Sequence, residues 1–213
     1  MKLTPTNNLI RGRNVTASEV GALMGEHPYM SPGRIFDRLT GAATLQLPNL
    51  AMDFGSDAEP ILARFAQRML ETSMSPAIYG PTRVRLNAQA FQHPRVRLCA
   101  TPDAFVYRRD LDGALDTDLL VELKLSWSQN RWRSGLPPDI EWQARAQLAC
   151  THRKRVIVYV FTGTEHVYIV DRHVGKERRM TQAVERFWRD HIDTGIRPQD
   201  PAPPEVVYWS AAS

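Results

Sequence analysis

The first part of the chain carries three segments with helical patterns. Helices are expected over residues 16–24, 31–40 and 49–71. Thr16-Ala-Ser-Glu19 is a capping box that opens the first helix, and Ser31-Pro32 combines a cap with a proline at the first helical position of the second. The third has apolar residues at helical spacing but contains Pro60, which predicts either a fresh start near Asp57 or a bend.

From Pro81 onward the pattern changes to period two. Val84 and Leu86 alternate with polar residues, which predicts a half-exposed strand. The further elements expected are strands over 96–106, 119–125, 155–161 and 166–170, and helices over 139–151 and 176–191. The helix over 139–151 is predicted to be amphipathic. This order predicts the α/β (α+β) class, with a mixed central sheet flanked by helices.

Length and composition indicate one well-packed domain. The chain has 213 residues, of which 43% are hydrophobic and 23% charged. We expect a single domain over residues 1–197 and a loosely held proline-rich tail over residues 198–213. The longest apolar run, Val156 to Phe161, is too short to span a bilayer, so no membrane association is expected.

The cysteines, the N-terminus and the net charge give weaker evidence about the compartment and the binding partner. The N-terminus lacks a secretory pattern, and Cys99 and Cys150 stand in no metal-ligand spacing, so a reducing cytoplasm is expected and the roles of both cysteines stay open. The net charge of +4 permits a polyanionic partner. The 27 cations comprise 23 arginines and only four lysines. Arginine is the better bidentate phosphate ligand, although a GC-rich genome gives the same bias.

The segment from Leu119 to Leu125 places two charges inside an otherwise apolar strand. Because side chains alternate along a strand, Glu122 and Lys124 share one face and the apolar residues between them share the other. Buried charges need partners. One interpretation is a structural ion pair. The other is a catalytic carboxylate beside an ammonium that orients or helps to deprotonate water, which a guanidinium does poorly.

A second carboxylate, Asp103, precedes Glu122 by 19 residues. A hairpin turn at Asp112-Gly113 would fold the two segments side by side. Neighbouring carboxylates repel each other, and a hard divalent cation relieves the repulsion. We therefore expect Asp103 and Glu122 to bind Mg²⁺, with Mn²⁺ as a substitute, the Leu123 carbonyl to complete the shell and Lys124 to position the attacking water. The alternative for Asp103 alone is a turn-capping role.

Glutamines and a further glutamate are candidates for the same site. Gln143 and Gln147 lie one helical turn apart, so they form either a solvated face or a pair that faces the metal. Glu59, in Gly55-Ser-Asp-Ala-Glu59, either supplies a third acidic group or lies at the surface.

Basic and aromatic residues suggest contacts to DNA. Arg11 and Arg13 precede the Thr16 cap and are placed to hold a phosphate near the positive end of that helix. Trp127 and Arg131, followed by another tryptophan and arginine, mix aromatic and basic side chains as a DNA-contacting loop does. Packing in the core is the alternative for the tryptophans.

These motifs resemble the lambda exonuclease-like, or YqaJ-type, phage recombinase nucleases of the PD-(D/E)XK superfamily. The resemblance runs in order from about Arg11 to Tyr168. Thr101-Pro-Asp103 is similar to the Ser-Pro-Asp-Gly of the family, Glu122-Leu-Lys124 to its Glu-hydrophobic-Lys, and Gly55 to Glu59 to its Gly-x-x-x-Glu.

The resemblance also implies residue roles in the N-terminal motif and on the following helix. Val15-Thr-Ala-Ser-Glu-Val20 is similar to a motif in which an arginine seven residues before the serine binds the 5′ phosphate. That implies roles for Arg11 and Ser18, with Arg13 as a second candidate. Gln143 and Gln147 fit the glutamine-bearing helix of the family.

The family resemblance implies a restriction-endonuclease-like PD-(D/E)XK core and a defined activity. The expected activity is Mg²⁺-dependent 5′→3′ degradation of one strand at the ends of linear double-stranded DNA. The product would be a 3′ overhang for a single-strand annealing protein in phage-type recombination. A homotrimeric ring in the cytoplasm of a bacterium or phage-infected host is also implied.

Two departures from the family pattern stand out, and two other functions stay open. Ala104 replaces the usual glycine, and Leu125-Ser126 replaces Cys-Pro, but neither change removes a metal ligand. The first alternative function is an endonuclease of restriction or repair type, which needs no 5′-phosphate pocket. The second is a catalytically inactive DNA-binding module on the same fold.

Overall fold

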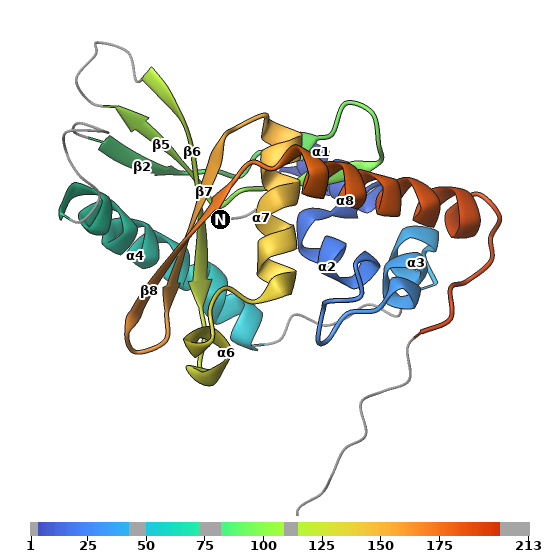
Figure 1. The fold of residues 1–213 in the computed structure, drawn as a ribbon, viewed down its shortest axis with the longest axis horizontal. Coiled ribbons are helices and arrows are strands. Elements are labelled where there is room, and N and C mark those ends of the chain that lie inside the picture. The colour runs from blue at the N-terminus through green and yellow to red at the C-terminus, as the bar shows by residue number, and fades with distance from the viewer. Residues whose placement is uncertain (1–3, 43–49, 73–81, 109–114, 201–213) are drawn as a thin grey trace, which may run out of the picture.

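A five-stranded mixed sheet lies at the centre of the fold (Figure 1). The computed structural model describes residues 4–42, 50–72, 82–108 and 115–200. In sheet order the strands are β2 (Thr82–Leu86), β5 (Ala104–Arg108), β6 (Leu115–Leu125), β7 (Arg155–Phe161) and β8 (Glu165–Asp171). Strands β6 and β7 are parallel, and the other neighbours are antiparallel. The parallel step requires a crossover, which runs through two helices.

Helices cover both faces of this sheet. The α-helices of the described residues are α1 (Pro5–Gly12), α2 (Val20–Leu23), α3 (Pro32–Thr40), α4 (Leu50–Thr72), α6 (Asn130–Arg133), α7 (Pro138–Thr151) and α8 (Val174–Phe187). Helix α4 packs on one face and α7 on the other (Figure 1). The alternation of β6 sorts its side chains accordingly: Val121 and Leu123 face α4, and Leu120 faces α7. The predicted mixed sheet with flanking helices is confirmed.

A second, smaller sheet joins α2, α3 and α8 on the outer side of α7. Its order is β1 (Val15–Thr16), β4 (Leu98–Ala100), β3 (Phe91–Gln92). The strand predicted over 96–106, with an interruption at Thr101-Pro102-Asp103, is two strands, and the prediction of one strand is wrong because β4 and β5 belong to different sheets. The break falls at Thr101-Pro102-Asp103, where the chain passes from one sheet to the other. Strands of two residues, such as β1 and β3, are too short to show a periodic pattern.

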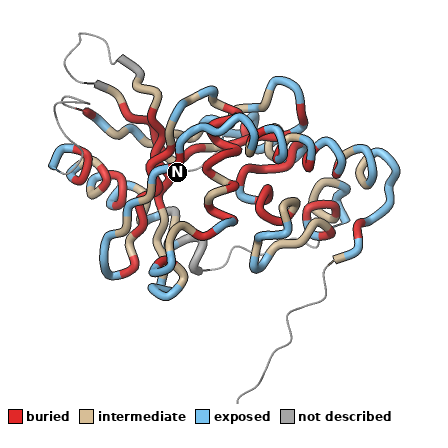
Figure 2. Tube along the Cα trace, in the orientation of Figure 1, coloured by how far each residue is buried: buried red, intermediate tan, exposed pale blue. Residues whose placement is uncertain are grey.

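The prediction that the helix over 139–151, now α7, is amphipathic is wrong. Ten of its 14 residues are buried, and they include Asp139, Arg145 and Gln147 (Figure 2). The helix contacts the main sheet on one side and α2, α8 and β4 on others, so every face is covered. Close approach depends on small residues: a Cβ on Gly21 of α2 would lie 3.0 Å from the Cα of Asp139.

Most other predicted elements are confirmed, with changed boundaries. The capping box is present, with the Thr16 amide donating to Glu19 at 2.8 Å, and Ser31 caps α3. Helix α4 runs through Pro60 without a fresh start, although this proline removes one backbone hydrogen bond and crowds the preceding turn. The Asp112-Gly113 turn lies outside the described residues. Helix α8 is followed by a π-helical segment, Trp188–Ile192.

The two cysteines are fixed by burial, and the start of the tail is fixed by a hydrogen bond and an ion pair. Cys99 and Cys150 are unpaired and buried, and burial raises the pKa of the Cys99 thiol to about 11. Asp200 accepts a hydrogen bond from the Gly33 amide at 2.9 Å and pairs with Arg197 at 2.8 Å. The first tail residues are therefore fixed on α3, while residues 201–213 lie outside the described part. The boundary at residue 198 stays a prediction.

None of the helices in the described ranges combines the length and apolar character needed to cross a bilayer.

Candidate active site

Strand pairing brings the two predicted catalytic carboxylates together. Ala104 pairs with Val121 across β5 and β6, so Asp103 lies just beyond the paired segment and beside the end of β6. The Asp103 Oδ2 atom accepts a hydrogen bond from the Leu123 amide at 2.8 Å. Glu122, only 1% exposed, lies one residue along, and its Oε1 is 2.6 Å from the Nζ of Lys124. The structure therefore places Asp103, Glu122 and Lys124 in one cluster.

Helix α7 supplies two amides to the same carboxylate. Gln143 Nε2 donates to Glu122 Oε1 and Gln147 Nε2 donates to Glu122 Oε2, each at 2.5 Å. The spacing of four residues puts both side chains on the face of α7 that covers β6. The alternative of a solvated glutamine face is wrong, since Gln147 is fully buried. Its Oε1 atom has no hydrogen-bond partner among the described residues.

The charges of the cluster do not balance. Burial, and then the charge of Glu122, raise the pKa of Asp103 well above its ordinary range, although Lys124 and the Leu123 amide oppose the rise. Burial alone would lower the pKa of Lys124, but Glu122 and Asp103 outweigh it and the net shift is upward. Two carboxylates thus share one ammonium. A further cation, or a proton on Asp103, would neutralise the excess.

The donor set fits a hard divalent cation. Carboxylate oxygens are the ligands that Mg²⁺ prefers, and Asp103 and Glu122 offer two of them at one place. Glu59 contributes electrostatically, because its charge is a further cause of the raised pKa of Asp103. Within the described residues, however, no three Asp, Glu, His or Cys side chains gather into a metal-binding group. Coordination by Glu59 and by the Leu123 carbonyl stays a prediction.

Phosphate-binding candidates lie next to this cluster. The Nη1 of Arg11 donates to the Thr101 hydroxyl at 3.3 Å, two residues before Asp103. Ser18 is exposed, with its Oγ 3.1 Å from that of Thr16. Arg13 is exposed at the C-terminal end of α1. Arg11 thus approaches the strand break that carries Asp103, whereas Arg13 makes no such contact within the described part of the chain.

A pocket of about 280 Å³ joins the catalytic and phosphate-binding candidates. Its lining residues are Ser18, His27, Lys124, Leu125, Ser126, Arg131, Trp132, Asp139, Ile140 and Gln143. Ser18, from the N-terminal motif, therefore faces the same space as Lys124 and Gln143. Among the predicted site residues, Ser18, Lys124, Arg131 and Gln143 line this cavity.

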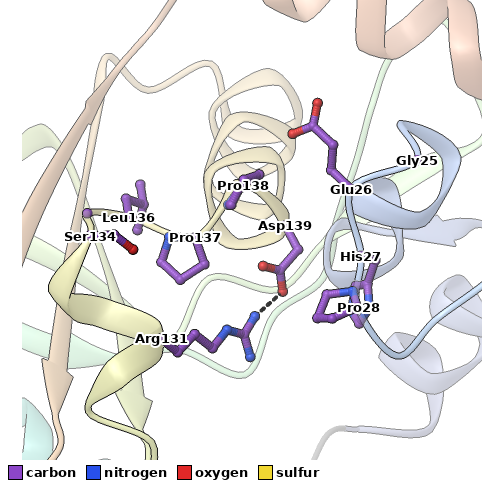
Figure 3. Close-up of a pocket in the computed structure, with 11 residues that line it drawn as sticks. Gly25, Glu26, His27, Pro28, Arg131, Ser134, Leu136, Pro137, Pro138 and Asp139 are labelled. Carbon is purple, nitrogen blue, oxygen red and sulfur yellow. Dashed lines mark hydrogen bonds and ion pairs between the residues drawn. The ribbon is translucent and has the colours of Figure 1, made fainter. Parts of the chain in front are cut away.

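Arg131 reaches this pocket in an ion pair. It binds Asp139, a buried residue at the start of α7. An adjoining pocket of about 620 Å³ is shown in Figure 3, where Arg131 and Asp139 point toward each other and His27 approaches from the loop after α2. Burial lowers the pKa of His27, and its Nδ1 accepts from the amides of Tyr29 and Met30. His27 therefore orders this loop as a neutral side chain.

The two tryptophans of the predicted DNA-contacting loop differ. Trp132 is 3% exposed and packs in the core, so the packing alternative holds for it. Trp127 is 79% exposed. The structure also adds Thr101, His27 and Asp139 to the site. Thr101 stands next to the Pro-Asp pair in the sequence, but His27 and Asp139 carry no local signal.

Comparison with known proteins identifies the family to which the chain belongs. The YqaJ-like viral recombinase domain matches residues 8–154, which is most of the chain. The chain belongs to this family. It is a nuclease that acts on DNA, and the acidic cluster with its lysine lies inside the matched region. No curated protein matches the chain.

Solved structures share the fold over nearly its full length. An alkaline exonuclease from Laribacter hongkongensis, LHK-Exo, aligns with a TM-score of 0.65 and 23% identity, covering 91% of this chain and 94% of that one. Its complex with dAMP aligns at 0.62 and 22%, covering 89% and 92%. A phage related exonuclease from Haemophilus somnus 129PT aligns at 0.58 and 10%, covering 89% and 99%. The restriction-endonuclease-like core is thereby confirmed.

Proposed function

We propose that this chain is a Mg²⁺-dependent exonuclease, with Mn²⁺ as a substitute, that degrades one strand of linear duplex DNA in the 5′→3′ direction. The product is a 3′ single-stranded overhang suited to recombination. Support comes from the family, from the exonuclease names of proteins with the same fold, and above all from one pocket.

The observation that carries the proposal is the shared space of Ser18, Lys124 and Gln143. Arg11 reaches the Thr101 hydroxyl, two residues before Asp103. A terminal 5′ phosphate held by Arg11 and Ser18 would lie close to the cluster that cleaves the next phosphodiester. Such a pocket favours strand ends over internal bonds, because an internal phosphate has a further nucleotide attached.

Asp103 and Glu122 are the residues that would hold Mg²⁺. The chemistry that a bound Mg²⁺ supplies is polarisation of water and of phosphoryl oxygens. Gln143 and Gln147 fix both oxygens of Glu122, so this carboxylate keeps one orientation. Lys124, kept protonated by its neighbours, orients the attacking water and offsets negative charge on the phosphate.

The proposal is tested with linear duplexes that carry a label at either the 5′ or the 3′ end. With Mg²⁺, the 5′ label should leave first as a mononucleotide, while the 3′ label stays on long fragments. EDTA should stop the reaction. Early release of the 3′ label would contradict the polarity, and rapid cutting of closed circular duplex would favour an endonuclease.

Variants test the phosphate pocket separately. Arg11→Ala should reduce the preference for 5′-phosphorylated over 5′-hydroxyl ends by about tenfold, the scale of one lost charge-assisted hydrogen bond. Arg13→Ala reports whether the second arginine contributes. Arg178→Ala, on the exposed face of α8, is the matched control for loss of charge. An unchanged preference in Arg11→Ala would place the 5′ phosphate elsewhere.

The proposal extends to assembly and partners through the family resemblance. A homotrimer and delivery of the overhang to a single-strand annealing protein in the cytoplasm are its further parts. Sedimentation velocity of the chain with and without duplex DNA tests the trimer.

A further inference from the structure

Two exposed aromatic rings meet beside the catalytic strand. Trp127 is 79% exposed and Phe54 is 52% exposed. Their ring centroids are 6.0 Å apart and their planes are inclined by 35°. A tryptophan left in water loses a large favourable contribution from burial. A pair of such rings, contributed by segments far apart in sequence, is therefore a candidate binding surface.

Each residue of the aromatic pair lies on or shortly after an element that contributes to the catalytic cluster or acts on it. Trp127 is the third residue after Lys124, and three residues span at most about 10 Å. The intervening Ser126 amide donates to the Phe161 carbonyl at 3.0 Å, which fixes the start of the loop. Phe54 lies on α4, the helix that also carries Glu59, whose charge acts on Asp103. The rings are therefore within reach of a strand held at the cluster.

The geometry of the rings selects one stacking face. A base inserted between two rings needs two stacking distances of about 3.4 Å each. The centroid separation of 6.0 Å is too small for that. A hollow of about 490 Å³ lies beside Trp127, lined also by Ser128, Gln129, Asn130 and Thr162. Phe54 does not line this hollow, so Phe54 supports the indole and the hollow borders its free part.

The chemistry of the hollow suits a nucleobase. An indole provides a stacking surface for any base. Amide and hydroxyl groups both donate and accept hydrogen bonds, which fits the varied edges of the four bases. The Gln129 amide is held by the Thr162 carbonyl at 3.2 Å, which orders this wall. Arg133 follows on α6 and is exposed, so its charge favours the phosphates of the same strand.

We propose that Trp127, supported by Phe54, is a stacking platform for one unpaired base of the DNA strand that is being degraded. This role rests on the proposed function and deepens it: the site holds the strand by a base as well as by its phosphate. Because stacking is insensitive to base identity, the platform suits an enzyme that must accept every sequence.

The test combines an altered base with an altered ring. An abasic analogue is placed in turn at each of the first three nucleotides of the degraded strand. At one position the wild-type KM should rise about tenfold, the scale of one lost stacking contact, with kcat little changed. Trp127→Ala should show the raised KM on intact DNA and no further rise on abasic DNA. Trp127→Phe should restore most of the affinity.

Ile169→Ala, which removes an exposed apolar side chain on β8, is the matched control and should behave as wild type. If Trp127→Ala leaves KM unchanged, or if the ring and base effects add independently, the platform is disproved. Anisotropy of the same DNAs in EDTA repeats the comparison without catalysis. There, a tenfold loss common to Trp127→Ala and the abasic probe supports the platform even if 5′→3′ degradation fails, and no loss disproves it.

Discussion

Two buried glutamates, Glu19 and Glu122, show how differently this protein treats a carboxylate. Glu19 accepts from the Thr16 amide and from two nitrogens of Arg38, at 2.6 and 2.7 Å. Its charge is matched by one guanidinium, which also holds the backbone carbonyls of Arg11 and Asn14. Glu19 is therefore a structural group whose ion pair closes the N-terminal region.

Glu122 is as buried as Glu19, but different groups compensate its negative charge. Two neutral amides and one ammonium surround it, and that ammonium is shared with Asp103. The contact between Glu122 and Lys124 satisfies the structural interpretation of this pair, but it leaves the second carboxylate unmatched. The comparison teaches that burial alone does not mark a catalytic acid. What distinguishes Glu122 from Glu19 is a second carboxylate, Asp103, that shares the single ammonium of Lys124.

The largest expected difference is in catalysis. Glu122→Gln removes a ligand charge and should lower the cleavage rate at least about a thousandfold, since a metal site contributes several kcal/mol to transition-state stabilisation. Circular dichroism should show a folded protein that still binds duplex DNA. If Glu122→Gln and Lys124→Ala both unfold, the result would support the interpretation of Glu122 and Lys124 as a structural ion pair. Near-normal turnover would remove Glu122 from catalysis.

Glu19→Gln should have the opposite outcome. Leaving Arg38 without its charged partner should lower the free energy of unfolding by about 1 to 2 kcal/mol, between the values for exposed and buried ion pairs, because the Arg38 side chain is 32% exposed. Urea denaturation measures this loss, and the folded fraction should cleave 5′-hydroxyl duplexes at nearly the wild-type rate. A stable but inactive Glu19→Gln protein would contradict the division between the two glutamates.

Mg²⁺ should stabilise only through the Glu122 cluster. At a concentration of one hundred times Kd, binding to the folded state adds about 2.7 kcal/mol. Thermal denaturation with and without Mg²⁺ should therefore show a shift for wild type and for Glu19→Gln, but none for Glu122→Gln. An equal shift in all three would place the ion elsewhere.

The smallest expected effect concerns pH without metal. Because the pKa of Asp103 is raised on folding, the folded protein binds this proton more tightly than the unfolded chain does. Its contribution to stability is present in acid and is lost as pH rises from the ordinary value of 3.8 through the raised pKa. In EDTA, Asp103→Asn should match wild type in acid and have a higher Tm at neutral pH. Parallel Tm profiles would contradict the raised pKa.

Local sequence signals predicted much of the fold and the centre of the site. The alternation of β6 set Glu122 and Lys124 on one face, and helical spacing set Gln143 above Gln147. What local patterns could not give was the environment of α7, because burial on all sides depends on segments distant in sequence. Most polar residues of α7 find partners on β6, on α6 or within the helix, so their burial leaves no mark in the local sequence.

Contacts between separate segments were also beyond local patterns. His27 and Asp139 reach the site through packing of the α2 region against α7, which no spacing encodes. The exchange of sheets between β4 and β5 depends on the partners of each strand, not on the strand itself.

The crowded position of α7 also affects which substitutions the enzyme tolerates. Ala144 and Ala146 are fully buried, and a methyl group on Gly21 would lie 3.0 Å from Asp139, closer than an ordinary contact. A larger side chain at any of these places would push the helix axis, and with it both amides that hold Glu122. Variants far from DNA can therefore be inactive although every DNA-facing residue is intact. A search for hyperactive or thermostable forms should leave these three positions untouched and draw its diversity from the solvent-facing side of α8, because α4 carries Phe54 and Glu59.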